Sequence, residues 1–215
     1  SHQALEMLLL IYQQDKNWGD AIETAKKLAN SDFSFHTEVA QFNCELAQEA
    51  IIKSSLIKAQ EFAHTALETN RKCVRANILL GEVFYNLENY ADAIQTWQAI
   101  EKQNYQYLPL IMDKMFDAYL RLNKTKECIT LIKGYVTLYP KLNMHDFVYQ
   151  KLNSYDSSES TLEYLRTAML HTPNAKIAAL LIDARVNALE TPDGKRDAEQ
   201  IKNILLKYNS KLSSY

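Results

Sequence analysis

Residues 79–100 read LLGEVFYNLENYADAIQTWQAI, and this stretch decides the fold. After the polar turn Glu88-Asn89-Tyr90, apolar residues follow at i, i+1, i+4 and i+7 from Ala93, which is the spacing of one helix face. Before the turn, Gly81 stands inside a second apolar helical segment, where a glycine costs about 1 kcal/mol relative to alanine. Close packing of another helix against Gly81 would explain that cost. The stretch therefore predicts two helices that are joined by a short turn and pack closely.

The same arrangement returns along the whole chain. Each predicted turn is followed by a marker residue, mostly small, that opens an apolar helix, and the five markers are Ala21, Ala59, Ala93, Cys128 and Thr161. They lie 33 to 38 residues apart, and a period of about 34 residues with a small residue at one place is typical of tetratricopeptide repeats. Each repeat is a pair of helices, here called helix A and helix B. The sequence therefore predicts an all-α fold, a right-handed tetratricopeptide (TPR) solenoid of about six helix pairs.

The repeat register divides the chain into six units. The first five are TPR units, of which the first is truncated on its N-terminal side, and the sixth is a divergent helix pair; they span residues 1–36, 37–72, 73–107, 108–141, 142–174 and 175–215. Pro140 and Pro173 are expected to end the fourth and fifth units, because proline cannot continue a helix. In the sixth unit we expect helices over 177–189 and 198–208, joined by a turn at 191–194.

Composition fits a folded protein and excludes several functional classes. Hydrophobic residues make up 47% of the chain and charged residues 23%, so a core can form. Only 4 glycines and 4 prolines argue against an all-β fold. A formal net charge of −2 gives no electrostatic case for binding nucleic acid or an anionic membrane. The longest apolar runs fall well short of the roughly 20 residues that a membrane span needs, and no signal peptide is recognisable.

No motif predicts catalysis or metal binding. Histidines and cysteines lack the spacing of a zinc site, and no phosphate-binding or nucleophile loop occurs. Asp113 and Asp117 can share a helix face, but such pairs are far more often solvated surface than an acid/base couple. We interpret Cys44, Cys73 and Cys128 as reduced packing residues of a cytosolic protein. The chain is therefore predicted to be no enzyme.

The predicted contact surface is the concave face of the solenoid, which helix A of each repeat lines. In the second to fourth units this face mixes charges, amides and apolar groups, as protein-binding surfaces do. The expected partner-binding residues are Gln48, Arg75, Ile78, Glu82, Tyr85, Asn86, Asp113, Asp117 and Arg121. Tyr85 and Arg121 are the expected hot spots by residue type. Cys44 is expected on the same face.

Three patterns leave alternatives open. Trp18, Tyr90 and Trp97 fall at core positions of the repeat, which favours packing over a ligand role. The basic residues Arg71, Lys72 and Arg75 fit either a favourable position near a helix C-terminus or contact with an acidic partner. Exposed apolar residues on the A helices could also join copies of the domain; they are Ile51, Ile52, Ile78 and Leu120.

Several stretches together resemble one bacterial family. They are LLLIYQ at 8–13, VAQFNCELA at 39–47, CVRANILLG at 73–81 and YLP at 107–109. In this order they resemble lipopolysaccharide assembly protein B (LapB, also YciM), and the resemblance covers essentially the whole chain. The CELA and VRANILLG stretches are much more specific than the general repeat pattern.

The resemblance implies an adaptor of the Gram-negative inner membrane that faces the cytoplasm. Members of this family carry an N-terminal membrane helix, a TPR domain and a C-terminal rubredoxin-like zinc ribbon. They promote degradation of the deacetylase LpxC by the membrane protease FtsH and are not themselves hydrolases. Other inner-membrane lipopolysaccharide assembly or regulatory proteins, and a second copy of the chain, are further expected partners.

The chain departs from the family pattern at both ends. It carries neither the membrane helix nor the C-x-x-C pairs of the ribbon, so we expect no zinc in it and no membrane contact of its own. The resemblance then implies a truncated or divergent form on the cytoplasmic side. The alternative function is a structural TPR scaffold that self-associates or organises a lipopolysaccharide assembly complex.

Overall fold

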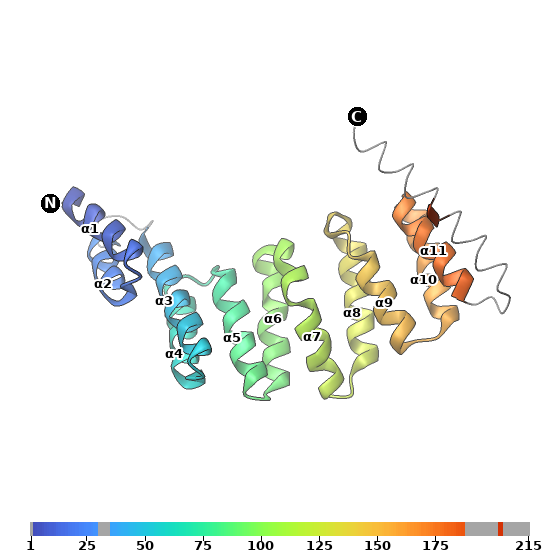
Figure 1. Cartoon of the computed structure of the whole chain (residues 1–215), viewed down its shortest axis with the longest axis horizontal. Coiled ribbons are helices and arrows are strands. Elements are labelled where there is room, and N and C mark those ends of the chain that lie inside the picture. Colours follow the sequence, from blue (N-terminus) through green and yellow to red (C-terminus); the bar gives the residue numbers. More distant parts are fainter. Residues whose placement is uncertain (1, 30–34, 188–201, 204–215) are drawn as a thin grey trace. The chain divides into compact units, whose positions relative to one another are not determined.

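The computed structural model describes residues 2–29, 35–187 and 202–203, and they form helices without any strand (Figure 1). The α-helices are α1 (His2–Gln14), α2 (Trp18–Ala29), α3 (Phe35–Ile52), α4 (Leu56–Thr69), α5 (Val74–Asn86), α6 (Tyr90–Asn104), α7 (Leu108–Arg121), α8 (Thr125–Leu138), α9 (His145–Tyr155), α10 (Ser158–His171) and α11 (Ala175–Asn187). Short 3-10 helices follow α6 and α8, namely η1 (Tyr105–Tyr107) and η2 (Pro140–Leu142). The all-α prediction is confirmed.

The chain divides into two compact units. The N-terminal unit is Ser1–Lys124 and the C-terminal unit is Thr125–Tyr215. The division separates α7 from α8, which the sequence analysis placed in one repeat (108–141). Within the described part of the chain, every helix is too short or too polar to cross a bilayer.

Consecutive helices of the N-terminal unit pack on one another from α1 to α7, and α3 also contacts α5. The small marker residues explain how the helices come close. Ala21, Ala59 and Ala93 are each 0% exposed, because a side chain that ends at Cβ lets a neighbouring helix approach. The small residues at the predicted markers therefore lie in the core.

Gly81 and Trp97 show how closely two helices of a repeat pack. A Cβ atom at Gly81 of α5 would lie 2.2 Å from Nε1 of Trp97 on α6. Trp97 is 1% exposed, and its Nε1 donates to the carbonyl of Ile78 at 3.2 Å. The packing role predicted for Trp97 is confirmed. Trp18 and Tyr90 are half-buried, and Trp18 stacks on Phe42 with ring centroids 5.8 Å apart.

A left-handed residue follows each A helix of the N-terminal unit. These residues are Lys16, Ser54, Glu88 and Asn123, with φ between 53° and 60°. In the turn after α5, the Asn89 amide donates to the Phe84 carbonyl at 2.8 Å and the Glu88 amide to the Tyr85 carbonyl at 3.0 Å. These bonds satisfy the last carbonyls of the helix, as in a Schellman motif. At these four positions other residues stand where glycine is usual.

The C-terminal unit packs α8 on α9, α9 on α10 and α10 on α11. Helix α8 ends at Leu138 and α10 ends at His171, so the two predicted proline stops are confirmed. Helix α11 covers most of the helix predicted over 177–189. The turn predicted at 191–194 lies outside the described residues, and so does the helix predicted at 198–208 except for 202–203.

Candidate protein-binding surface

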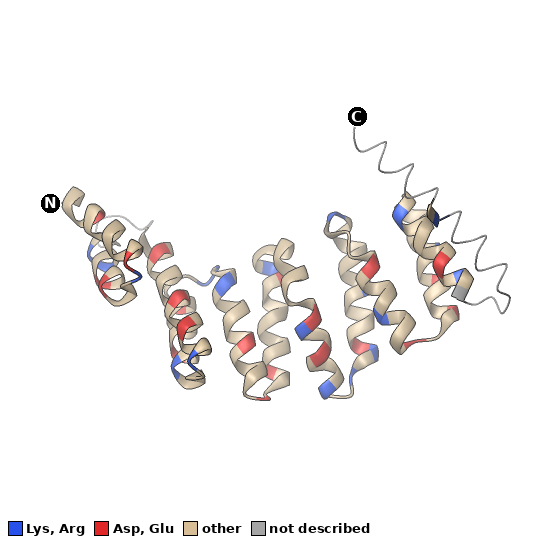
Figure 2. Cartoon of the chain, in the orientation of Figure 1, with Lys and Arg blue, Asp and Glu red and all other residues tan. Residues whose placement is uncertain are grey.

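All nine predicted partner-binding residues lie on three A helices of the N-terminal unit. Helix α3 carries Gln48, helix α5 carries the five residues from Arg75 to Asn86, and helix α7 carries Asp113, Asp117 and Arg121. Figure 2 shows acidic positions along α3 and both acidic and basic positions along α5 and α7. A surface of this kind favours a partner that offers both hydrogen-bond donors and acceptors.

Three of the predicted residues meet at the junction of α5 and α7. The Tyr85 hydroxyl donates to Oδ2 of Asp117 at 2.5 Å, and Nε of Arg121 donates to the same oxygen at 3.3 Å. The hydrogen bond to Asp117, together with partial burial, raises the pKa of Tyr85 above its ordinary value. The two expected hot spots, Tyr85 and Arg121, therefore share one carboxylate. Since Asp117 is engaged by a tyrosine and an arginine, its position does not resemble an acid/base couple with Asp113.

Lys114 is a surface residue that the sequence analysis did not identify. Its Nζ pairs with Oε1 of Glu82 at 2.5 Å, so that a second polar contact joins α7 to α5. The two residues lie 32 positions apart, close to one repeat period. Opposite charges on A helices at one repeat spacing are the signal that could have found this pair.

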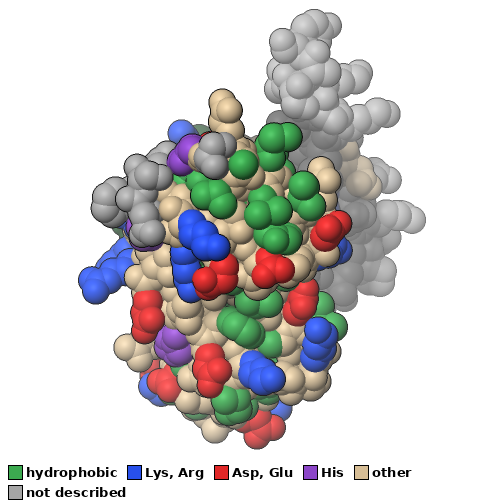
Figure 3. All heavy atoms as spheres, turned by 90° about the vertical axis from the view of Figure 1, so that its left-hand side faces the viewer, with side chains coloured by type: hydrophobic (Ala, Val, Ile, Leu, Met, Phe, Trp, Pro, Cys, Tyr) green, Lys and Arg blue, Asp and Glu red, His purple; other side chains and the backbone are tan. Residues whose placement is uncertain are grey.

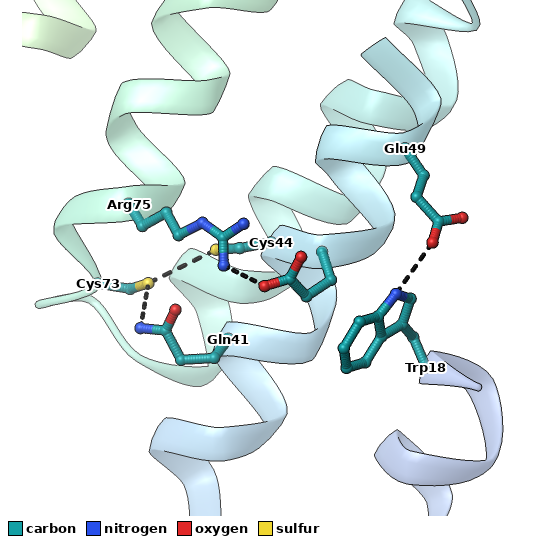
Figure 4. Close-up of polar contacts among 7 residues, drawn as sticks. Trp18, Gln41, Cys44, Glu49, Cys73 and Arg75 are labelled. Carbon is teal, nitrogen blue, oxygen red and sulfur yellow. Dashed lines mark hydrogen bonds and ion pairs between the residues drawn. The ribbon is translucent and has the colours of Figure 1, made fainter. Parts of the chain in front are cut away.

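Arg75 makes the same kind of contact between α5 and α3 (Figure 4). Its guanidinium donates to Oε1 of Glu45 at 2.5 Å, and this hydrogen bond raises the pKa of Arg75. Arg75 lies in the first turn of α5. A favourable position near a helix C-terminus therefore does not explain this residue, whose acidic neighbour comes from its own chain.

The other predicted residues are more dispersed. Asn86 and Asp113 are exposed, whereas Gln48 and Ile78 are half-buried. The structure gathers Glu82, Tyr85, Asp117 and Arg121 around the junction of α5 and α7. Arg75 lies at the separate junction of α5 and α3.

Two expectations about apolar surface residues are wrong. Cys44 is 0% exposed and cannot contact a partner, because its face of α3 packs toward α5. Of the four apolar residues proposed to join copies, only Ile52 is exposed, at 74%. Ile51, Ile78 and Leu120 are half-buried, and Ile51 packs against the core.

Polar contacts between successive A helices also occur in the C-terminal unit. The Tyr149 hydroxyl of α9 donates to Oδ2 of Asp183 on α11 at 2.7 Å, and Lys176 of α11 forms an ion pair with Asp146 of α9. Each pair is about one repeat apart, as in the N-terminal unit. Polar residues of the A helices therefore stabilise the contacts between repeats as well as forming the surface.

The described residues contain no group of three or more His, Cys, Asp or Glu side chains that could hold a metal ion. The structure does bring two cysteines together that the sequence analysis treated as separate. Sγ of Cys44 lies 3.7 Å from Sγ of Cys73 (Figure 4). No sequence motif predicts this pair, because its two cysteines are 29 residues apart.

Helix pairs that recur at one period, with buried small markers and contacts between successive A helices, define a protein of the TPR class. The comparisons are more specific. The chain is 23% identical over 203 residues to Lipopolysaccharide assembly protein B of Escherichia coli strain K12. The aligned region covers 94% of this chain and 52% of that protein. The protein of the same name from Haemophilus influenzae is 30% identical over 125 residues, 58% of this chain and 31% of the relative. The resemblance found in the sequence is therefore confirmed.

The chain spans about half the length of the Escherichia coli relative. No family model matches it. Among solved structures, the one described as "Functional Characterization of Pseudomonas Aeruginosa pilF" superposes with a TM-score of 0.51 and is 17% identical, covering 100% of this chain and 97% of the other. At this identity the superposition supports the fold alone.

Proposed function

We propose that the chain is the repeat portion of a non-enzymatic, protein-binding adaptor in lipopolysaccharide assembly. The observation that carries the proposal is the similarity to Lipopolysaccharide assembly protein B over 94% of the chain. In the finer form of the proposal, the adaptor acts at the cytoplasmic side of the Gram-negative inner membrane. There it holds the deacetylase LpxC, the protease FtsH or both, and so promotes degradation of LpxC.

The proposed contact surface is the exposed edge of α5 and α7. The Arg121 side chain is 59% exposed and that of Lys114 is 49% exposed, so both can exchange their present partners for groups of another protein. Such an exchange replaces one ion pair with another and costs little desolvation at an exposed edge. Tyr85 contributes a rigid ring whose hydroxyl already has an acceptor, and tyrosine and arginine are frequent interface hot spots.

Direct binding tests this proposal. The chain is immobilised, and its affinity for purified LpxC and for the soluble domain of FtsH is measured by surface plasmon resonance. We expect Arg121→Glu to weaken binding about tenfold, because it reverses a charge at the centre of the proposed surface. Arg166→Glu is the matched control, because Arg166 is an exposed arginine on the B helix α10. Equal affinity of the two variants would reject this surface, and no binding of the native chain to either protein would reject these partners.

An exposed apolar stripe on α1 favours a second function, a scaffold that self-associates. Met7, Leu10 and Ile11 are 68%, 58% and 51% exposed and lie at i, i+3 and i+4. Figure 3 looks onto the end of the N-terminal unit and shows hydrophobic side chains gathered there. Sedimentation at decreasing concentration tests the scaffold: it predicts an oligomer that Leu10→Glu dissociates, and a monomeric native chain contradicts it.

A further inference from the structure

The two neighbouring thiols lie in the core between α3 and α5. Cys44 is 0% exposed and Cys73 is 4% exposed, and their Sγ atoms are 3.7 Å apart. Figure 4 shows the two sulfur atoms facing one another from the two chain segments. This separation is van der Waals contact, so a modest side-chain rotation would bring the sulfurs to the bonding distance of about 2.0 Å.

Cys73 has an environment that favours its thiolate. It stands at the N-cap of α5, where the unpaired amides of a helix start attract negative charge. The Gln41 amide donates to Sγ of Cys73 at 3.8 Å. The hydrogen bond with Cys44, the backbone amides of Ala76 and Arg75, and the Arg75 charge together lower the pKa of Cys73, although burial acts in the opposite direction.

Cys44 and Cys128 behave differently from Cys73. The hydrogen bond with Cys73, together with burial, raises the pKa of Cys44, and either sulfur can be the donor of that bond. Cys128 of α8 is 1% exposed, and burial raises its pKa to about 12. All three thiols are buried, but Cys73 has a lowered pKa and lies beside Cys44. Cys128, whose pKa is raised, serves as an internal reference.

The basic residues beside Cys73 indicate which reagent it would meet. Arg71 and Lys72 immediately precede it in the turn between α4 and α5, and both are exposed. Together with Arg75 they place three cations within five positions of the chain. A small anionic molecule is attracted to such a cluster, and the attraction falls with ionic strength.

We propose that Cys44 and Cys73 form a reversible disulfide by exchange with an anionic low-molecular-weight disulfide of the glutathione type. The Cys73 thiolate attacks one sulfur of the reagent, forms a mixed disulfide and releases one thiolate, which takes a proton from solvent. The thiol of Cys44 then loses its proton and attacks the Cys73 sulfur, and a second thiol of the reagent leaves with that proton. Two cysteines are oxidised, and one disulfide is reduced to two thiols. The product links α3 to α5 beside the Glu45–Arg75 ion pair.

The test treats the folded native chain with oxidised glutathione, blocks the remaining thiols, and measures the intact mass and a non-reducing peptide map. We expect the loss of two hydrogen atoms and one cross-linked pair of peptides, those that contain Cys44 and Cys73. The map needs no substitution, so it does not depend on the folding of a variant. A folded chain that keeps all three thiols, or carries only mixed disulfides, would overturn the proposal.

Three variants assign the roles of the cysteines. In Cys44→Ala the mixed disulfide should accumulate on Cys73 severalfold faster than any adduct on Cys128, because Cys73 loses the hydrogen bond with Cys44 but keeps the helix start and Arg75 beside it. Cys73→Ala should give neither product, and Cys128→Ala should oxidise like the native chain. Circular dichroism first confirms that each variant is helical. Equal reaction of Cys73 and Cys128 in the folded Cys44→Ala variant would show that Cys73 is not activated.

Discussion

Helix α5 joins its two neighbouring A helices in different ways. Its start contacts α3 through the Glu45–Arg75 ion pair, beside thiols that are almost completely buried. Its end contacts α7 through Tyr85 and Asp117, near the exposed Arg121. One helix thus combines a junction that contains two buried thiols and a partly exposed ion pair with an open junction, where another protein can reach the exposed Arg121. The comparison teaches that residues on one face of a repeat helix need not have one role.

The largest expected effect comes from removing the Trp97 side chain, which packs against α5 from α6. Trp97→Ala should lower the free energy of unfolding of the N-terminal unit by about 3–5 kcal/mol, because it empties the site of a large buried aromatic. Urea unfolding followed by far-ultraviolet circular dichroism measures the change. Trp18→Ala is the control and should cost clearly less, because Trp18 is half-buried. Equal losses would contradict the anchoring role of Trp97.

The next effect concerns the close approach of α5 and α6. Gly81→Ala places a Cβ against Trp97 and should destabilise the chain by about 1–3 kcal/mol through overpacking. Gly134→Ala is the matched control in α8, where a Cβ meets no atom within 4 Å. There the substitution should stabilise the helix by about 0.5–1 kcal/mol. Thermal unfolding shows whether each variant is more or less stable than the native chain. A stabilised Gly81→Ala variant would refute the predicted clash.

Removing one hydroxyl tests the open junction. Tyr85→Phe should cost about 1 kcal/mol, since the lost hydrogen bond has a charged acceptor but is partly exposed to solvent. Urea unfolding near neutral pH measures this loss. Unchanged stability would mean that the Tyr85–Asp117 contact does not hold α5 to α7.

The Tyr85 hydroxyl should also make the stability of the open junction depend on pH. Because the pKa of Tyr85 is raised in the folded state, its stabilisation is complete below the unfolded value of about 10 and is lost as the pH rises through the folded value. The native chain should therefore lose more stability than Tyr85→Phe between about pH 9 and pH 11. Parallel pH profiles of the two proteins would contradict this assignment.

The smallest expected effect is a difference between the two junctions in how strongly salt weakens their polar contacts. The coupling energy between Glu45 and Arg75, measured by a double-mutant cycle with glutamine substitutions, should fall by about 0.5 kcal/mol or less from about 0.05 M to about 0.5 M salt. The Tyr85–Asp117 coupling, measured with Tyr85→Phe and Asp117→Asn, should change less, because one partner is neutral. The reverse order would show that screening does not distinguish the two contacts.

Much of the fold could be predicted because its signals are local. The stretch 79–100 places a turn and a marker residue in register, and the helices begin and end near the predicted positions. Gly81 and Trp97 were both assigned to the core, and they meet there. The candidate site was predicted less well. Tyr85, Asp117 and Arg121 do lie together, but Cys44 is buried, and Lys114 was overlooked.

The sequence by itself determined the helix pairs and their period, because apolar spacing, turn residues and small residues act within one repeat. The tertiary structure decided which polar residues contact one another, since hydrogen bonds and ion pairs depend on distances between helices about 30 residues apart. The same distances placed Cys44 beside Cys73 and left the stripe of Met7, Leu10 and Ile11 in solvent. Local patterns specify the repeat, and the packing of one repeat on the next specifies the surface.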